Sequence, residues 1–139
     1  MTPAEFVAAQ AAGMIERVLQ QRVVGTCRVL GLRCYHTHDS RRSEPGFPDC
    51  VIAAPQGPIY AELKREKKRP TIDQIYWLDY FAGLGLPVYL WRPHHFIDGT
   101  IGMILDGTAV GEGVDDGRWI AGEGVRGDKW STVAVKRGS

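Results

Sequence analysis

The chain of 139 residues lacks the features that mark several protein classes. Its three cysteines are odd in number and form no Cys-x-x-Cys pair, which argues against a disulfide framework and a four-cysteine zinc site. No apolar run approaches the roughly 20 residues of a membrane span, and no signal-peptide pattern is present at the first residues. We therefore expect a protein of the reducing cytoplasm that has no membrane partner.

The chain also lacks an excess of charge of either sign. Its 17 Lys and Arg against 16 Asp and Glu give a net charge of +1, so a nucleic-acid partner has to be argued from where the cations lie. Residues 98–139 carry seven acidic and five basic side chains and 10 of the 17 glycines. We therefore expect a more basic core over residues 1–97, and an extension over 98–139 that is part of the same domain or an assembly element.

The hydrophobic pattern predicts an α/β fold. In chain order we expect one or two helices over 4–30, strands at 32–36, 49–54 and 59–63, a helix from a capping box at Thr71 to about Leu84, and a strand at 88–91. This α-β-β-β-α-β order predicts a central mixed sheet flanked by helices. The glycine-rich extension is expected to be β-structured, with short strands at 118–121 and 132–135.

The hairpin over residues 49–63 places two carboxylates and one ammonium group at one end of the sheet. Glu62 and Lys64 are two residues apart in a strand, so their side chains project from one face, about 7 Å apart along the strand. Asp49 opens the neighbouring strand and reaches the same end. The alternative is an ordinary Glu-x-Lys ion pair at the surface.

Two carboxylates at one point favour a hard divalent cation such as Mg²⁺, and the carbonyl of Leu63 is a further candidate ligand. A bound cation activates water and stabilises negative charge on a phosphoryl group. In such a site Lys64 would position or deprotonate the water, or neutralise the developing charge.

These residues resemble the PD-(D/E)xK nuclease superfamily, and are most similar to its virus-type replication-repair nuclease (VRR-NUC) domain in stand-alone, phage-type form. The resemblance spans about residues 16–96. It rests on Glu16, Tyr35-His36, Asp39-Ser40-Arg41-Arg42-Ser43, Gly46-Phe47-Pro48-Asp49, Glu62-Leu63-Lys64 and Thr71-x-x-Gln74. It implies a restriction-endonuclease-like core, and it leaves residues 98–139 unexplained.

The resemblance also implies roles for single residues. Asp49 and Glu62 would be the principal ligands of Mg²⁺ or Mn²⁺, Lys64 the catalytic lysine, and Glu16 the helix glutamate that completes the metal site. Glu5 is a rival for this last role, because it also lies on an amphipathic helix.

Gln74 matches the family's helix glutamine that supports the catalytic site. As the third residue of a capping box, Gln74 could instead bond back to the backbone of Thr71 and never face the metal. Both interpretations stay open at this point.

Two basic loops flank the proposed site. Their cations are Arg41 and Arg42 in the first loop, and Arg65, Lys67, Lys68 and Arg69 in the second. Such clustering favours contacts with a phosphate backbone rather than sequence readout, although a charge run is more often a solvated loop. We add Ser40 to this set, and His36 as a candidate to contact a phosphate or to orient Asp49. The His94-His95 pair is expected to lie on the surface.

The combined prediction is a metal-dependent DNA endonuclease without an organic cofactor. The resemblance implies a branched substrate, such as a four-way junction, and a homodimer, since two matched cuts need two sites. Two alternatives remain: a non-catalytic nucleic-acid binding module on the same fold, and a phage structural or packaging-associated protein in which residues 98–139 form an interaction surface.

Overall fold

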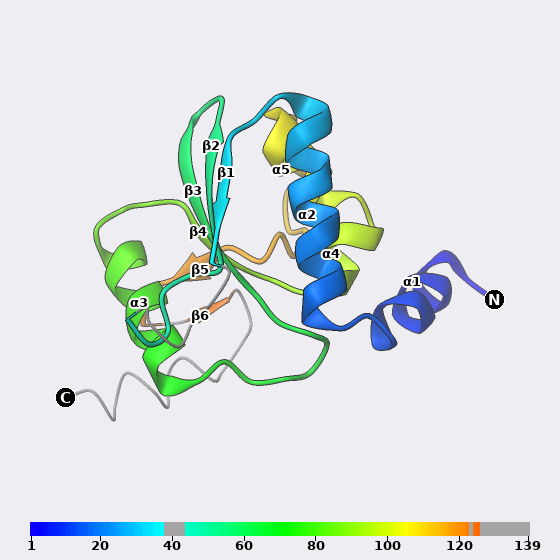
Figure 1. The fold of residues 1–139 in the computed structure, drawn as a ribbon. Helices are drawn as coiled ribbons and strands as arrows, with labels where there is room; N and C mark the ends of the chain where they lie inside the picture. Colours follow the sequence, from blue (N-terminus) through cyan, green and yellow to red (C-terminus); the bar gives the residue numbers. More distant parts are fainter. Residues whose placement is uncertain (38–43, 123, 126–139) are drawn as a thin grey trace.

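A computed structural model describes residues 1–37, 44–122 and 124–125, and it places a four-stranded sheet between helices (Figure 1). The elements are, in chain order, α1 (Pro3–Ala12), α2 (Glu16–Leu30), β1 (Cys34–His36), β2 (Cys50–Ala54), β3 (Gly57–Leu63), α3 (Ile72–Gly83), β4 (Val88–Trp91), α4 (Pro93–Ile97), α5 (Thr100–Asp106), β5 (Trp119–Ile120) and β6 (Gly124–Val125). The order α2-β1-β2-β3-α3-β4 confirms the expected α-β-β-β-α-β core. Within the described ranges, no helix is both long and apolar enough to cross a membrane.

The sheet has the strand order β1-β2-β3-β4 and mixes both pairing directions. Strands β1 and β2, and β2 and β3, pair antiparallel, and β4 pairs parallel to β3. A parallel pair needs a crossover, and α3 provides it between β3 and β4. The expected mixed sheet is therefore confirmed.

Two hydrophobic clusters cover the two faces of the sheet. On one face, α2 and α5 pack against alternate residues of β2 and β3, including Ile52 and Ile59. On the other face, Ile75 and Leu78 of α3 pack against Val88 and Leu90 of β4. Figure 1 shows the sheet between α2 and α3. The alternation of side chains along each strand thus fills both clusters.

The expected helical stretch over residues 4–30 divides into α1 and α2. The division falls at Gly13, which caps the end of α1, whereas Gly25 lies inside α2. Gly31 ends α2 with a left-handed φ of 73°, which glycine adopts without steric cost. Helix α2 begins at Glu16. This glutamate lines a cleft together with Asp49 and Glu62 of the β2–β3 hairpin.

The chain after β4 forms two short helices that the sequence analysis did not predict. Helices of five and seven residues, α4 and α5, are too short to show a hydrophobic period. Ile101 and Leu105 of α5 are fully buried in the same cluster as α2. Strand β5 lies within the expected strand 118–121, and the strand expected at 132–135 lies outside the described residues.

Candidate active site

Asp49 and Glu62 face each other at the open end of the β2–β3 hairpin. Cys50 pairs with Ala61, so the next antiparallel pair outward is Asp49 with Glu62, and side chains of such a pair lie on the same face. Oδ2 of Asp49 accepts the amide hydrogen of Leu63 at 2.9 Å. This bond fixes the Asp49 carboxylate over the end of β3.

Lys64 follows Glu62 by two residues and is also buried, with 3% of its surface exposed. Its amide donates to the carbonyl of Trp91 at 3.0 Å, which continues the parallel pairing of β3 and β4 beyond Leu63. Its positive charge lowers the pKa of Glu62. The arrangement is therefore not an exposed ion pair, because both side chains lie in the interior.

The Glu62 carboxyl lies in an environment that disfavours its charge. Burial raises its pKa well above the ordinary value, and the hydrogen bond and negative charge of Asp49 raise it further. The charge of Glu16 acts in the same direction, against the opposing effect of Lys64. Within the described part of the chain, Oε2 of Glu62 is buried and has no hydrogen-bond donor. In the absence of a cation, the environment therefore favours the protonated form of Glu62.

Gln74 contacts both of its expected partners. Its Oε1 accepts the amide hydrogen of Thr71 at 2.8 Å, and the hydroxyl of Thr71 accepts the amide hydrogen of Gln74 at 3.2 Å, which completes the capping box of α3. At the same time, Nε2 of Gln74 donates to Oε1 of Glu62 at 3.2 Å. Gln74 thus makes the capping contact with Thr71 without being turned away from Glu62, and its support of catalysis stays a prediction.

Asp49, Glu62 and Gln74 line an open cleft of about 770 Å³, whereas the buried Lys64 is not among its lining residues. Its lining also includes Glu16, Tyr35, Thr37 and Thr71. A smaller cavity of about 90 Å³ joins Glu16, Asp49 and Leu63. The structure thus brings Glu16 to the two hairpin carboxylates, whereas Glu5 caps α1 through Thr2 and does not line the cleft.

The donor set of the cleft fits a hard divalent cation. Three carboxylates, from Glu16, Asp49 and Glu62, lie at one end of the sheet, and such oxygen ligands are those preferred by Mg²⁺ and Mn²⁺. The buried oxygen of Glu62 that lacks a donor is a free position for a cation. The residues present therefore suit the metal that the sequence analysis expects.

The loop before Asp49 is fastened to α3. Nε1 of Trp77 donates to the carbonyl of Pro45 at 3.0 Å, and the ring of Phe47 packs edge-to-face on that of Trp77 with centroids 5.2 Å apart. Gly46 has a φ of 83°, and a Cβ there would lie 2.6 Å from the amide nitrogen of Gln74. The Gly-Phe-Pro-Asp stretch therefore positions Asp49 and the first turn of α3 together.

A buried arginine holds the second basic loop. Nη1 of Arg92, a residue with 8% of its surface exposed, donates to the carbonyls of Arg65 and Lys68 at 2.8 Å each. The side chains that point to solvent in this loop are those of Arg65, Lys67, Lys68 and Arg69. Sequence reasoning missed Arg92, because nothing in its neighbourhood along the chain signals a contact with residues 24 and 27 positions earlier.

Lys68 connects the basic loop to the acidic cleft. Its Nζ lies 3.4 Å from Oε2 of Glu16. Since the Lys68 side chain is 56% exposed, this ion pair contributes little to stability, but it directs one cation of the loop to the rim of the cleft.

The remaining candidates for DNA contact are His36, Ser40, Arg41 and Arg42. His36 lines a separate cavity with Gln20, Val24 and Arg28, whereas its neighbours Tyr35 and Thr37 line the acidic cleft. The alternation of side chains along β1 is the signal that could have selected these two neighbours from the sequence. Ser40, Arg41 and Arg42 lie outside the described residues.

Comparison with known proteins supports the fold. No protein-family model matches the chain, and no curated protein matches its sequence. A solved structure described as a VRR_NUC domain superposes with a TM-score of 0.52 over 62% of this chain and 92% of that chain, at 24% sequence identity. The protein therefore has the fold of a VRR_NUC domain, as the resemblance of residues 16–96 implied.

Proposed function

We propose that this protein is a metal-dependent DNA endonuclease of the VRR-NUC family. The observation that carries the proposal is the pairing of Asp49 with a buried Glu62 two residues before the buried Lys64, on the fold of a VRR_NUC domain. The family is built on nuclease chemistry, and phosphodiester hydrolysis needs a cation, a water molecule and a proton acceptor or cationic side chain close together.

Asp49, Glu62 and Glu16 would hold Mg²⁺ or Mn²⁺, together with the carbonyl of Leu63. When bound, such a cation lowers the pKa of a water molecule and stabilises negative charge on the phosphoryl group. The Asp49 carboxylate is already oriented for metal binding, because its Oδ2 accepts the amide hydrogen of Leu63. Glu62 is held from the other side by Gln74.

Lys64 would act on the attacking water or on the developing charge. It lies in the interior beside Glu62, where an ammonium group interacts with its surroundings more strongly than in water. Gln74 would act as a positioning residue, since it donates to one oxygen of Glu62, while the other oxygen has no hydrogen-bond donor among the described residues.

The DNA backbone would lie across the basic loop and the mouth of the cleft. Arg65, Lys67, Lys68 and Arg69 extend into solvent from a backbone that Arg92 holds in place. We place Ser40, Arg41, Arg42 and His36 in the same binding surface on the strength of the sequence alone. Contacts of this kind recognise phosphates and shape, and we propose a branched substrate such as a four-way junction, cut by a homodimer.

The decisive experiment is a cleavage panel on linear, nicked and four-way-junction DNA with Mg²⁺ or Mn²⁺. We expect cleavage that chelation abolishes and that falls to background in Asp49→Asn and Lys64→Ala. Glu112→Gln is a matched control, because Glu112 is exposed and does not line the cleft. Cleavage that persists in both variants contradicts the mechanism.

The same panel distinguishes the two alternatives. A non-catalytic module would bind DNA in a salt-sensitive manner without cutting it at any metal concentration. A structural or packaging-associated protein would show neither cutting nor affinity for DNA. Among the described residues, one buried oxygen of Glu62 has no hydrogen-bond donor, which costs free energy. A bound cation would offset this cost, so the observation favours the catalytic interpretation.

A further inference from the structure

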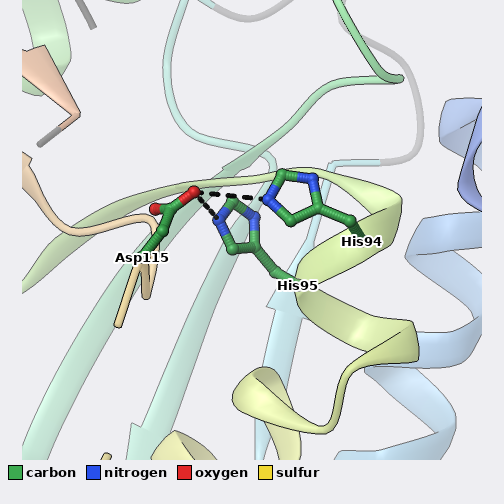
Figure 2. A group of neighbouring side chains, drawn as sticks. All are labelled: His94, His95 and Asp115. Carbon is green, nitrogen blue, oxygen red and sulfur yellow. Dashed lines mark hydrogen bonds and ion pairs between the residues drawn. The ribbon is translucent and has the colours of Figure 1, made fainter. Parts of the chain in front are cut away.

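The histidines of α4 belong to a proton-sharing cluster that supports the second basic loop. Figure 2 shows the rings of His94 and His95 directed at the carboxylate of Asp115. Nδ1 of His94 lies 2.9 Å from both carboxylate oxygens of Glu66 in the loop. Nδ1 of His95 accepts the amide hydrogen of Arg92 at 2.9 Å, so its Nε2 carries the proton and is not a metal ligand. The expectation that both histidines lie on the surface is wrong, because His95 is 1% exposed. The cluster therefore fastens the loop to α4.

Helix α2 and strand β1 carry positive charge that no carboxylate interrupts. Residues 17–38 contain four arginines and no Asp or Glu, although the whole chain is nearly neutral. The arginines are Arg17, Arg22, Arg28 and Arg33. They are five or six positions apart and form no run along the chain, so only the fold shows which of them lie together.

One face of α2 carries two of these arginines. At about 100° per residue, Arg17 and Arg28 are separated by three turns and about 20°, so both project from the same side of the helix. Gln20 and Gln21 lie between them, within about 60° of Arg17. Arg22 is turned about 140° from Arg17 and belongs to another face. Guanidinium and amide groups both donate hydrogen bonds to phosphates, so this basic face of α2 consists of phosphate-binding side chains.

Two cavities connect the basic face of α2 with the proposed metal site. The first, of about 90 Å³, contains proposed metal ligands and the start of the face, and its lining residues are Glu16, Arg17, Gln20, Asp49 and Leu63. The second, of about 310 Å³, lies where α2 runs beside β1 (Figure 1), and its lining residues are Gln20, Gln21, Val24, Arg28 and His36. Because Gln20 lines both cavities, the surface continues from the metal site along α2.

We propose that the basic face of α2 binds the phosphates of one DNA strand where this strand leaves the metal site. The inference rests on the proposed function and extends its DNA-binding surface. A phosphodiester backbone fits this surface, because its phosphates would run from the point of hydrolysis past Arg17 to Arg28. The ion pair of Lys68 with Glu16 brings the second basic loop to the first turn of α2, so the two basic surfaces adjoin.

The length of α2 gives the spacing of the two arginine contacts. Helical residues rise about 1.5 Å each, so Arg17 and Arg28 are about 16 Å apart along the helix axis. One strand of a duplex carries a phosphate about every 3.4 Å of its axis. In a duplex arm aligned with α2, Arg28 would therefore contact the strand about five nucleotides farther from the scissile bond than Arg17.

The test is fluorescence anisotropy of the full-length protein with duplex DNA at several salt concentrations, with a chelator present so that the DNA stays intact. Arg17→Gln and Arg28→Gln should each reduce the slope of log K against log salt by about 1. Arg22→Gln, on another face of the same helix, should leave the slope unchanged, and Arg28→Lys should retain it. All these side chains are exposed, and circular dichroism checks that each variant is folded.

A cleavage assay with Mg²⁺ tests the spacing. The DNA arms on either side of the cut made by the parent protein are shortened in turn to about two nucleotides. With one arm short, Arg28→Gln should cut as fast as the parent protein, whereas Arg17→Gln should remain slower.

The outcomes separate this inference from the proposed function. If Arg28→Gln has the slope of the parent protein, or if Arg22→Gln loses as much as Arg28→Gln, the inference is overturned even when the parent protein cuts DNA. A loss confined to Arg17→Gln and Arg28→Gln supports the inference even when the parent protein binds DNA without cutting it, and the nuclease function alone then fails. A parent protein that binds no DNA overturns both.

Discussion

Gln74 contacts Thr71 and Glu62 with the two ends of a single amide group. Its Oε1 accepts from the Thr71 amide at 2.8 Å, and its Nε2 donates to Glu62 at 3.2 Å. The reverse orientation of the amide would set a donor against the Thr71 N–H and an acceptor against a carboxylate, so the two contacts fix one orientation. The start of α3 and the position of the buried carboxylate are therefore coupled.

This coupling predicts different outcomes for two variants at the same helix end. Gln74→Ala should cost about 1 kcal/mol of unfolding free energy and raise the Mg²⁺ concentration needed for cleavage about 10–100-fold. Thr71→Ala should cost a similar stability, because it removes the cap, while the contact of Gln74 with Glu62 remains. Urea unfolding and Mg²⁺ titration of cleavage measure the two effects. An equal metal requirement in both variants would refute a positioning role for Gln74.

Gly46→Ala should destabilise the protein by at least about 2 kcal/mol, because a left-handed backbone and a clash with α3 act together. A Cβ at Gly46 would lie 2.5 Å from the carbonyl oxygen of Asp73. Gly85→Ala is the matched control, since Gly85 has a φ of 82° and no atom near its Cβ position. Denaturant unfolding should show the larger loss at Gly46; equal losses would argue against the close approach.

The metal-free protein should lose stability as the pH rises above 4.5. The folded pKa of Glu62 is raised above the ordinary value of 4.5, so the folded state holds more protons than the unfolded chain between these two values. The contribution is fully present below pH 4.5 and is lost as the pH rises through the folded pKa. Glu62→Gln should remove this dependence, and Mg²⁺ should restore the stability of the parent protein alone. Urea unfolding over a pH series with chelator tests the sign; a flat profile in the parent protein would contradict it.

Lys67→Gln should weaken binding of every DNA substrate to a similar extent and reduce the slope of log K against log salt by about 1. The side chain of Lys67 is exposed on the basic loop, and under the proposed function its ammonium group contacts a phosphate. Arg33→Gln is the control, because Arg33 is exposed near Ala53, at the far end of the β2–β3 hairpin from Asp49. Fluorescence anisotropy at several salt concentrations gives the slope for each variant. If Lys67→Gln has the same slope as the parent protein, Lys67 does not contact the DNA backbone.

We propose that the residues after 97 share the core of the preceding part, and Ile101→Ala tests this. Ile101 is fully buried beside α2 residues, so its truncation should cost about 2–5 kcal/mol in one cooperative transition. Val114→Ala, at a side chain that is 41% exposed, should change stability by less than about 0.5 kcal/mol. Two separate unfolding transitions, with α2 unaffected, would instead indicate an independent extension.

The local signals of the sequence predicted the core order and the meeting of Asp49 with Glu62, whereas Glu16 was selected by the resemblance to the VRR-NUC domain. The hairpin turn, the alternation around Glu62 and the capping box at Thr71 each depend on residues within a few positions of one another. The structure shows the hairpin and the cap where these signals placed them. Their roles in catalysis stay predictions.

Contacts between distant parts of the chain could not be predicted in this way. Three such contacts depend on how β4 and the chain after it are placed against the sheet. They are the hydrogen bonds from Arg92 to the basic loop, the burial of His95 and the contact of Asp115 with His95. The amide of Gln74 also contacts Thr71 and Glu62 at the same time. A pattern along the chain cannot reveal such shared use, because it is a property of three-dimensional packing.

The separation of Glu16 from the hairpin has a consequence for biosynthesis. Asp49 and Glu62 meet as soon as β2 and β3 pair, but Glu16 reaches them only when α2 has packed on the sheet. The strand that completes this sheet, β4, is the last of the four to be synthesised. A chain emerging from the ribosome therefore contains all three acidic residues before the last strand of the sheet has been made. Under the proposed function, the nascent nuclease would stay inactive until its fold is complete.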